Sequence, residues 1–218
     1  MKNIILIPYR NREKHLKYWI ENTYPKLNKV LENLEVLVIE QSEDNKLFNR
    51  GKVLNVGFKY YDEDEYNYFT HDIDHNPINV DIYNHKINNN NILSIKSAHN
   101  ISLGGIIKFK GTVYKKINGF RNDYWGWGIE DRDLYYRSKF YNINIIRNNK
   151  IKFKILKHKH MGIEFNKIKS NKCNYIFKSN YNEIKKKFIL ESGLNNLKYK
   201  IVKEEIIKDN IKKIIINI

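Results

Sequence analysis

Short apolar segments alternate with helix-like segments along the first third of the chain, and this alternation restricts the fold more than any other feature. Residues 4–7 form an apolar run that ends at a proline, which is typical of a buried strand, and residues 35–40 repeat the pattern. Between them, Leu16, Trp19 and Ile20 recur at helical spacing. Strands that alternate with helices form a parallel sheet with right-handed crossovers, so the sequence predicts an α/β fold.

The rest of the 218-residue chain continues this mixture less regularly after residue 74. Neither an internal repeat nor a Pro- or Ser-rich linker divides it, so residues 1–218 are expected to form a single domain. Strands are expected at residues 4–7, 35–40, 66–74, 93–95, 105–109, 143–146, 152–160 and 211–218. Helices are expected at residues 12–24, 48–61, 112–118, 130–141 and 178–191, and an aromatic, glycine-rich loop at residues 124–128.

The chain is strongly basic, with 40 Lys and Arg against 24 Asp and Glu and a net charge of +16. Scattered lysines usually form a solvated surface, but such a charge also suits a nucleic acid, a nucleotide, an acidic glycan or a membrane face. The sequence carries no helix-turn-helix, zinc-finger or RNP-like motif, which argues against a nucleic-acid-binding module.

Cysteine use and hydropathy exclude several other classes of protein. The single cysteine, Cys173, cannot form an internal disulfide or a cysteine-based zinc site. No apolar stretch reaches the ~20 residues of a transmembrane helix, and the N-terminus lacks a signal-peptide pattern. The sequence therefore predicts an intracellular, cytoplasmic protein without a membrane anchor.

An aromatic and basic cluster directly follows the first predicted strand. Ligands of open α/β sheets bind at the carboxyl ends of the strands, and arginines beside an aromatic ring suit a nucleotide base and its phosphates. A strand-to-helix turn with surface arginines would give the same pattern. The residues are Pro8, Tyr9, Arg10 and Arg12.

A second cluster, His71-Asp72-Ile73-Asp74, closes the third predicted strand. We expect one carboxylate to reach a ribose and the other to bind a divalent cation, because hard cations that bridge a diphosphate prefer oxygen ligands. Acidic loops are common, but this acidic cluster directly follows an apolar predicted strand. That position places it at the ligand-binding edge of the sheet.

Tryptophan and glycine alternate at residues 124–128, directly before Glu130 and Asp131. Flat indole rings on a glycine-rich backbone are suited to holding a sugar. The two acids open the next predicted helix, where the helix dipole favours carboxylates. They either complement that dipole or include a general base that the dipole keeps ionised, and the unusual Trp-Gly pattern favours the second interpretation.

The pair His158 and His160 ends another predicted strand. Histidine is a common metal ligand, so two imidazoles close to a carboxylate site form a candidate metal site. A lone histidine is more often structural or merely exposed.

Seven motifs stand in an order known from one enzyme family. They are PYRNREKHLKYW (8–19), FNRGKVLNVGF (48–58), HDID (71–74), LGG (103–105), NGFRNDYWGWGIEDRD (118–133), KHKH (157–160) and GLNNLKY (193–199). Together they closely resemble the β-1,4-galactosyltransferases, glycosyltransferase family seven, over essentially the whole chain. The details of HDID and HKH look most like the xylosylprotein branch of this family.

The resemblance implies a GT-A fold, which is a Rossmann-like nucleotide-sugar-binding fold with a mainly parallel central sheet. It also implies an inverting, Mn²⁺-dependent transfer of a sugar, galactose in the first place, from a UDP-sugar to a glycan or glycoside hydroxyl in β-1,4 linkage. Residues that match nucleotide contacts of the family are Pro8, Tyr9, Arg10, Arg12, Phe48, Arg50, Asp72 and Ile73. Residues that match metal ligands are Asp74, His158 and His160.

The same resemblance assigns the sugar-binding and reacting groups. It implies that Asp131 is the catalytic base and that Trp127 belongs to a mobile loop which closes over the donor. Residues that match donor or acceptor sugar contacts are Ser102, Gly105, Tyr124, Trp127, Glu130 and Asp131.

Two positions depart from the family pattern. Arg132 replaces an acid that helps to hold the acceptor, so the acceptor is open. Ser102 replaces a tyrosine beside the C2 substituent of the sugar, so UDP-GalNAc and UDP-GlcNAc are alternative donors. A catalytically inactive glycan-binding relative is a further alternative. The chain lacks the stem and anchor of the animal enzymes, which favours an origin in a bacterium or a large virus.

Overall fold

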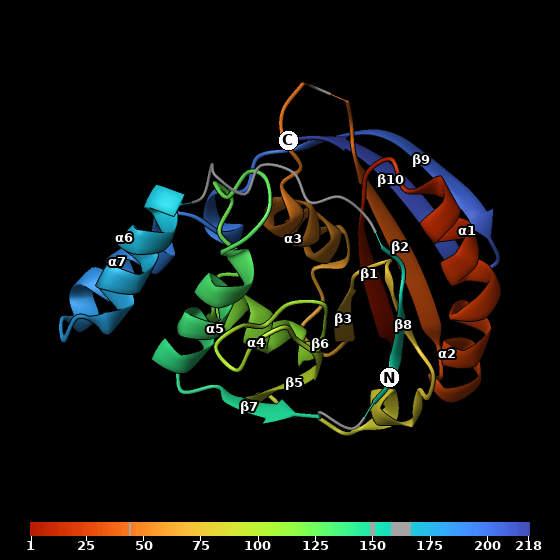
Figure 1. Cartoon of the computed structure of the whole chain (residues 1–218), viewed down its shortest axis with the longest axis horizontal. Coiled ribbons are helices and arrows are strands. Elements are labelled where there is room, and N and C mark those ends of the chain that lie inside the picture. The colour runs from red at the N-terminus through yellow and green to blue at the C-terminus, as the bar shows by residue number, and fades with distance from the viewer. Residues whose placement is uncertain (44, 149–150, 158–166) are drawn as a thin grey trace.

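A computed structural model describes residues 1–43, 45–148, 151–157 and 167–218, and its central element is an eight-stranded sheet (Figure 1). The strand order in these residues is β7-β5-β6-β3-β1-β2-β10-β9, and a two-stranded sheet joins β4 to β8. The strands are β1 (Asn3–Tyr9), β2 (Leu34–Gln41), β3 (Asn67–His71), β4 (His75–Pro77), β5 (Asn91–Lys96), β6 (Ile106–Lys110), β7 (Asn144–Arg147), β8 (Phe153–Ile155), β9 (Lys200–Lys208) and β10 (Ile211–Asn217).

Parallel pairing dominates the centre of the large sheet. β1 pairs in parallel with β2 and β3, and β2 pairs in parallel with β10. β6 runs antiparallel to both β3 and β5, and β9 antiparallel to β10, while β7 returns to a parallel pairing with β5. The expected α/β fold with a mainly parallel sheet is confirmed.

Helices cover both faces of this sheet (Figure 1). Ile4 and Leu6 of β1 belong to the core on one face, and Ile5 and Ile7 to the core on the other. Burial on both faces explains why β1 is a continuous apolar run instead of an alternating one. The helices are α1 (Glu13–Asn22), α2 (Tyr24–Val30), α3 (Arg50–Tyr61), α4 (Gly111–Lys116), α5 (Glu130–Phe140), α6 (Lys167–Lys178) and α7 (Asn182–Leu190), with short 3₁₀ turns at Asp81–Asn84 and Leu194–Asn196.

Each of the two cores is covered by its own set of helices. α3, α4 and α5 contribute to the core that contains Ile4, through residues such as Val53, Val113 and Leu134. α1 and α2 contribute Trp19 and Leu27 to the opposite core. α6 and α7 lie to one side and pack against α5 through a separate small cluster (Figure 1).

Several sequence-based boundaries were wrong, each for a local reason. The expected helix at residues 178–191 is α7 alone, because α6 ends where the Ser179 hydroxyl donates to the Ile176 carbonyl. The expected helix at residues 12–24 divides at Thr23 into α1 and α2. The strand expected to reach residue 74 ends at His71, where the chain turns and His75 N–H donates to Asp72 O.

Two further strands differ from expectation. The strand expected at residues 152–160 covers only Phe153–Ile155 in the described part, and residues 158–160 lie outside it. β9 was not expected, because its sequence KIVKEEIIK shows no simple alternation. Within the residues that the structure describes, no helix is long and apolar enough to cross a membrane.

Candidate active site

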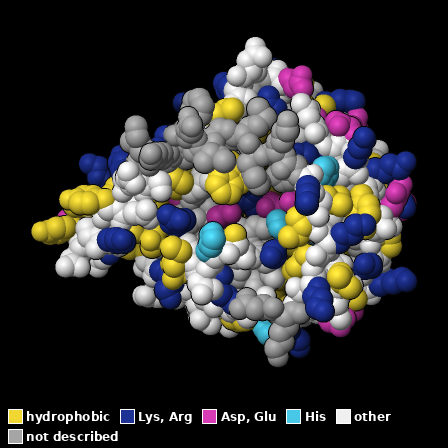
Figure 2. Space-filling view, viewed as in Figure 1, with side chains coloured by type: hydrophobic (Ala, Val, Ile, Leu, Met, Phe, Trp, Pro, Cys, Tyr) yellow, Lys and Arg dark blue, Asp and Glu magenta, His cyan; other side chains and the backbone are white. Residues whose placement is uncertain are grey.

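The carboxyl ends of β1 and β3 meet at one edge of the sheet, and the charged motifs follow them there. Residues 72–74 turn away from β3, and Arg12 follows β1. Burial lowers the pKa of the Arg12 guanidinium, and the nearby carboxylates of Asp74 and Asp72 partly offset this effect. On the face of the molecule that Figure 2 shows, acidic and histidine side chains gather near the middle, with Lys and Arg side chains around them.

Arg50 connects two of the predicted carboxylates. It is the first residue of α3, which Asn49 caps by accepting a hydrogen bond from Lys52 N–H. Arg50 Nε donates to Asp72 Oδ1 and Nη1 donates to Asp131 Oδ1, each at 2.8 Å, with the Arg50 side chain only 11% exposed. Its Nη2 is buried without a hydrogen-bond partner in the described structure. The free edge of this guanidinium can therefore donate to an anionic ligand such as a phosphate.

Glu130 and Asp131 form the first turn of α5, as the sequence indicated. Leu103 N–H donates to Asp131 O at 2.8 Å, and a Cβ on Gly104 would lie 1.8 Å from Asp131 Oδ2. Only glycine at 104 therefore leaves room for this carboxylate. Burial raises the pKa of Asp131, and Arg50 opposes that rise. Burial and the charge of Asp131 raise the pKa of Glu130 to about 8.

Asp72, Asp74 and His75 can meet at one point in the described structure. Each offers one ligand atom, and these atoms lie within 4.8 Å of one another. His75 Nδ1 lies 3.4 Å from Asp74 Oδ1. Two carboxylate oxygens and an imidazole nitrogen suit Mn²⁺ or a similar cation. His75 was not predicted as a ligand, although its position directly after Asp74 was a usable signal.

The other expected metal ligands, His158 and His160, lie outside the described residues, so their role stays a prediction. The chain approaches Asp74 shortly before them, because Leu156 N–H donates to Asp74 O at 2.9 Å. This bond brings the preceding segment to the proposed metal site.

His71 supports the turn from behind. It is fully buried, its Nδ1 lies 3.1 Å from Asp72 O, and the Tyr83 hydroxyl lies 3.0 Å from its Nε2. Burial lowers the pKa of His71 to about 3, so the ring is neutral near pH 7. A neutral ring can donate from Nδ1 and accept at Nε2, which fixes the backbone at Asp72.

The residues predicted to bind the nucleotide divide into partly buried and buried groups. The Arg10 guanidinium donates to Lys46 O at 2.7 Å, and Phe48 is partly buried against the core. Tyr9 is buried, its hydroxyl donates to Glu13, and burial raises its pKa to about 12. Pro8 and Ile73 are buried as well, and Ile73 belongs to the core that contains Ile5.

The aromatic, glycine-rich segment at residues 124–128, here called the tryptophan loop, lies along the segment before α3. Gly126 N–H donates to Phe48 O at 2.8 Å, and the Trp125 ring lies 5.5 Å from Lys46 Nζ and 5.9 Å from Lys52 Nζ. Trp127 is 50% exposed. The exposed part of the Trp127 indole faces solvent, where a sugar could contact it, and the Trp125 ring lies beside two cations.

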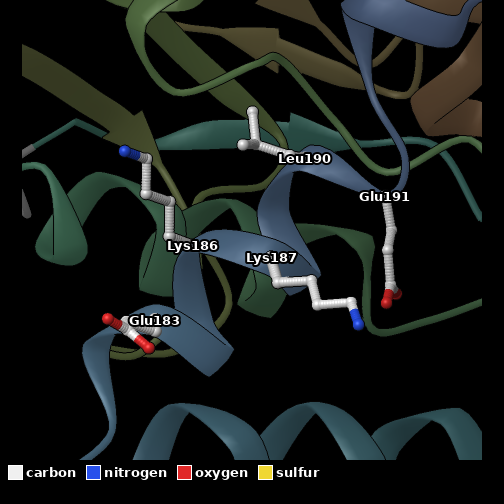
Figure 3. Close-up of a pocket in the computed structure, with 5 residues that line it drawn as sticks. All are labelled: Glu183, Lys186, Lys187, Leu190 and Glu191. Carbon is white, nitrogen blue, oxygen red and sulfur yellow. The ribbon is translucent and has the colours of Figure 1, made fainter.

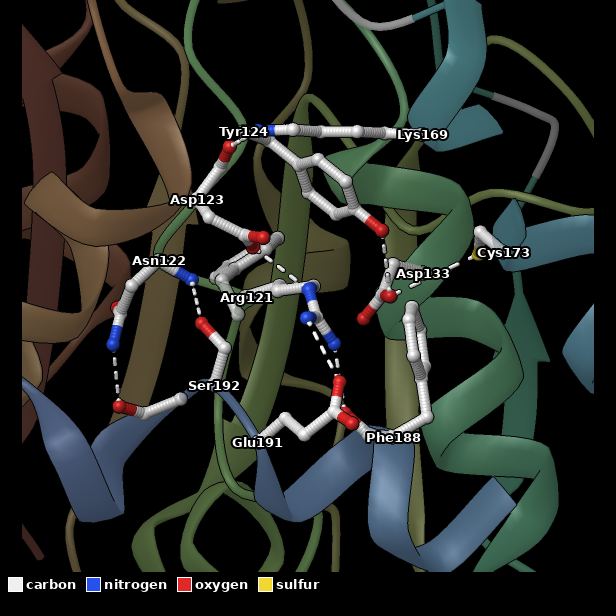
Figure 4. A network of polar contacts seen from close by, with 12 residues as sticks. Arg121, Asn122, Asp123, Tyr124, Asp133, Lys169, Cys173, Phe188, Glu191 and Ser192 are labelled. Carbon is white, nitrogen blue, oxygen red and sulfur yellow. Dashed lines mark hydrogen bonds and ion pairs between the residues drawn. The ribbon is translucent and has the colours of Figure 1, made fainter. Parts of the chain in front are cut away.

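Tyr124 is buried, and its expected contact with a sugar stays a prediction. Its hydroxyl donates to Asp133 Oδ2 at 3.0 Å, and its ring is 2% exposed (Figure 4). Arg121, Asp123 and Glu191 belong to the same network. In this arrangement Tyr124 anchors the base of the loop.

Ser102 and Gly105 lie in the segment between β5 and β6. Ser102 Oγ lies 2.7 Å from Ser97 Oγ, and Arg147 Nη2 donates to the carbonyl oxygens of residues 100 and 102. Gly105 has φ +70° and its carbonyl accepts from Asp72 N–H at 3.0 Å. This segment therefore connects the Asp72 turn with Asp131.

A hollow of about 470 Å³ lies away from this edge, on the surface of α7 (Figure 3). It contains none of the predicted site residues. Its lining residues are Glu183, Lys186, Lys187, Leu190 and Glu191.

The sheet and its carboxylate-bearing edge define the GT-A class of glycosyltransferase folds. The catalytic domain of Drosophila β-1,4-galactosyltransferase 7, solved with xylobiose, superposes with a TM-score of 0.78 at 25% identity, covering 99% of this chain and 92% of that one. A mutant of that protein solved with manganese, UDP-Gal and xylobiose gives a TM-score of 0.76 at 23% identity, covering 100% of this chain and 93% of that one.

Sequence comparisons show which family within the GT-A fold class this chain resembles. Residues 1–85 match the N-terminal region of glycosyl transferase group 7, and residues 84–161 match the N-terminal domain of galactosyltransferase. Bovine β-1,4-galactosyltransferase 1 is 33% identical over an alignment of 210 positions, which covers 92% of this chain and 50% of that protein. Drosophila melanogaster β-1,4-galactosyltransferase 7 is 29% identical over an alignment of 229 positions, which covers 100% of this chain and 69% of that protein.

This chain belongs to glycosyltransferase family seven, the β-1,4-galactosyltransferase family, as its motifs indicated. It spans about half the length of the first relatives that it matches. The GT-A fold is confirmed.

Proposed function

We propose that this chain is a metal-dependent, inverting glycosyltransferase that moves galactose from UDP-galactose to a sugar hydroxyl. The observation that carries the proposal is the Arg50 bridge between Asp72 and Asp131, which lies beside the Asp72–Asp74–His75 group. A guanidinium with one free edge, a candidate cation site and a carboxylate base are the parts that such a transfer requires. Relatives named β-1,4-galactosyltransferases support galactose as the sugar.

Asp74 and His75 are the residues that would hold Mn²⁺, with Asp72 as a third ligand and His158 and His160 as further candidates. The donor set fits, because two oxygens and one nitrogen lie within 4.8 Å of one another. A bound Mn²⁺ supplies charge neutralisation for the diphosphate and for the departing UDP. The solved relative that contains manganese and UDP-Gal supports Mn²⁺ as the cation.

Asp131 acts as the general base of the proposed reaction. The acceptor hydroxyl attacks the anomeric carbon from the face opposite UDP, and Asp131 takes the hydroxyl proton. Arg50 stabilises the ionised form of Asp131 and keeps one edge for the donor phosphates. Trp127 stacks on the bound sugar, and Glu130 contacts the donor sugar from the buried start of α5.

UDP release from a panel of donors tests the proposal. UDP-Gal, UDP-GalNAc, UDP-GlcNAc and UDP-Glc are each incubated with Mn²⁺ or EDTA, and with a xyloside or GlcNAc as acceptor. Release from UDP-Gal that needs both Mn²⁺ and an acceptor is the expected result. No release with any pair, together with no thermal stabilisation by UDP and Mn²⁺, would overturn it.

The donor could instead carry an N-acetyl group, and Ser102 favours this second candidate. Ser102 is small, buried and held by Ser97, so the segment beside Gly105 presents no large side chain at this position. Preferred turnover of UDP-GalNAc or UDP-GlcNAc in the panel would support it. Strict preference for UDP-Gal would exclude it.

The acceptor, the single domain and the cytoplasmic location remain proposals. A xylose-type acceptor is supported by the xylobiose bound to the solved relatives, and the xyloside arm of the panel tests it.

Limited proteolysis tests whether residues 1–218 behave as a single domain, and fractionation of the native cells tests the cytoplasmic location. Retention on DNA or RNA that falls with salt would favour the nucleic-acid-binding alternative, and binding of UDP or glycan without turnover an inactive relative.

A further inference from the structure

Ile129 has an unusual backbone conformation immediately before the two carboxylates of α5. Its φ is 84° and its ψ is −37°, close to a γ-turn conformation that is strained for L-residues. A β-branched residue with positive φ is a genuine outlier. Gly126 and Gly128 just before it also have positive φ, where glycine meets no steric penalty.

The turn at Ile129 sets the direction of α5. The carbonyl of Ile129 accepts hydrogen bonds from Arg132 N–H and Asp133 N–H, both at 2.9 Å. The chain therefore leaves the tryptophan loop and enters the helix at this residue. The Asp131 carboxylate reaches Arg50 and fits against Gly104, where a Cβ would collide with it, only if this first turn is correctly oriented.

The side chain of Ile129 explains why the strain persists. It packs against a small apolar cluster of Cys173, Ile176 and Phe188, which come from α6 and α7. Cys173 also contacts Asp133 Oδ2 at 3.8 Å, and Figure 4 shows this contact beside the labelled Phe188. A glycine at 129 could adopt the same backbone without strain, but it would have no side chain to reach the cluster.

We propose that Ile129 is a positioning residue that couples the α6–α7 pair to the reactive carboxylate. Packing against α6 and α7 holds Ile129 in its strained conformation, and that conformation orients Asp131 toward Arg50. The pair formed by α6 and α7 must therefore be docked for Asp131 to be in place. The inference rests on the proposed role of Asp131 as the base.

Two substitutions separate backbone strain from packing. Ile129→Ala removes the packing but keeps the Cβ that makes a positive φ costly, whereas Ile129→Gly removes both the packing and that cost. Ile129→Gly should therefore be more thermally stable than Ile129→Ala. An order reversed in favour of alanine would show that the strain is smaller than the entropy that glycine loses on folding, and would overturn the first step.

Kinetics test the second step. Both variants should lower kcat by roughly 10- to 100-fold, because small misplacements of a reacting group have effects of this size. Binding of UDP and Mn²⁺ should stay within about twofold of the parent, since these ligands are placed by other residues. Ile129→Val keeps the branched side chain and should restore kcat. Unchanged kcat in Ile129→Ala would contradict the coupling.

A double-mutant cycle tests the partner side. Ile176→Ala on α6 should reproduce the loss of kcat, and the effects of Ile129→Ala and Ile176→Ala should not add. Ile184→Ala on α7 is the matched control, because Ile184 is exposed and outside the cluster. Additive effects would overturn the proposal.

Hydrogen exchange of the α6 and α7 amides gives a readout that does not depend on turnover. Ile129→Ala should accelerate this exchange in the full chain, and Ile176→Ala should add little further. If the parent transfers no sugar, the proposed function fails, while the exchange cycle still decides whether Ile129 and α6 are coupled.

Discussion

Arg50 Nη1 lies 2.8 Å from Asp131 Oδ1, although the two residues are 81 positions apart in the sequence. The same guanidinium holds Asp72, so it links the starts of α3 and α5 to the turn after β3. The Arg50 side chain is 11% exposed, and water screens this attraction only weakly. Arg50 therefore stabilises Asp131 as a carboxylate against the burial that raises its pKa.

Replacing Arg50 should weaken transfer and change its pH dependence. Arg50→Lys keeps the charge but cannot contact Asp72 and Asp131 in the same fork geometry, so kcat/KM should fall by roughly 10- to 100-fold. Arg50→Gln also removes the positive charge, so the pKa of Asp131 should rise. The base then stays protonated to higher pH, and the acidic limb of the rate profile should move upward. Rate profiles of the two variants check this, and an unchanged limb in Arg50→Gln would contradict it.

Asp131→Asn should abolish transfer while leaving UDP binding nearly intact. An amide cannot accept the proton of the acceptor hydroxyl, and a missing general base costs about 10²- to 10⁴-fold in rate. The amide oxygen can still accept a hydrogen bond from Arg50, so the site keeps its geometry. Turnover and calorimetric binding of UDP with Mn²⁺ are the two measurements. Normal turnover in this variant would show that another group is the base.

The core of the fold was predictable because its strands are buried on both faces. The run from Ile4 to Ile7 and the helix around Val53 are rich in apolar residues, so their burial could be predicted from composition. β9 has little such signal, since most of its residues are exposed and its pairing with β10 creates the strand. α6 was missed because its apolar residues Cys173 and Ile176 face α5 and α7, and that neighbourhood is not visible in the sequence.

The site could be predicted only where local motifs carry it. Asp72, Asp74, Glu130 and Asp131 stand in short motifs at strand ends or helix starts, and the structure places Asp72 and Asp131 on the same guanidinium. The burial of Tyr124 could not be predicted, because it depends on Asp133 and on residues from α6. Long-range contacts of this kind need the fold itself.

His75 should contribute to metal affinity if it is a ligand. His75→Ala should weaken Mn²⁺ binding by about 10- to 100-fold, the usual effect of altering a metal site. Titration of Mn²⁺ in the presence of UDP measures the affinity, with EDTA-treated protein as the starting point. His158→Ala and His160→Ala are the comparison. A loss confined to those two variants would remove His75 from the ligand set.

The ion pair between Arg137 Nε and Asp133 Oδ1 should be important for stability. Both side chains are fully buried, and Arg137 also donates to the carbonyl oxygens of Asn118, Gly119 and Ser192. Arg137→Met leaves Asp133 without its cation in the interior, which typically costs about 3–5 kcal/mol. Chemical denaturation measures the change in the free energy of unfolding.

A surface ion pair provides the control for that change. Lys17 Nζ and Glu21 Oε1 lie 4.0 Å apart on α1 with both side chains exposed. Lys17→Met should change the free energy of unfolding by less than ~0.5 kcal/mol. Equal losses in the two variants would mean that burial does not strengthen the Arg137–Asp133 interaction.

Glu130 should make the protein less stable as the pH rises through neutrality. Its pKa is raised from 4.5 to about 8, chiefly by burial, so the folded protein keeps a proton that the unfolded chain has already released. The folded state binds more protons than the unfolded state in this range, and its free energy of unfolding therefore falls as pH increases from about 4.5 to 8. Glu130→Gln is neutral at every pH and should remove this part of the decline. Melting temperatures of parent and variant measured across that range should diverge with rising pH. Parallel curves would show that Glu130 is already ionised in the folded protein at the start of the range.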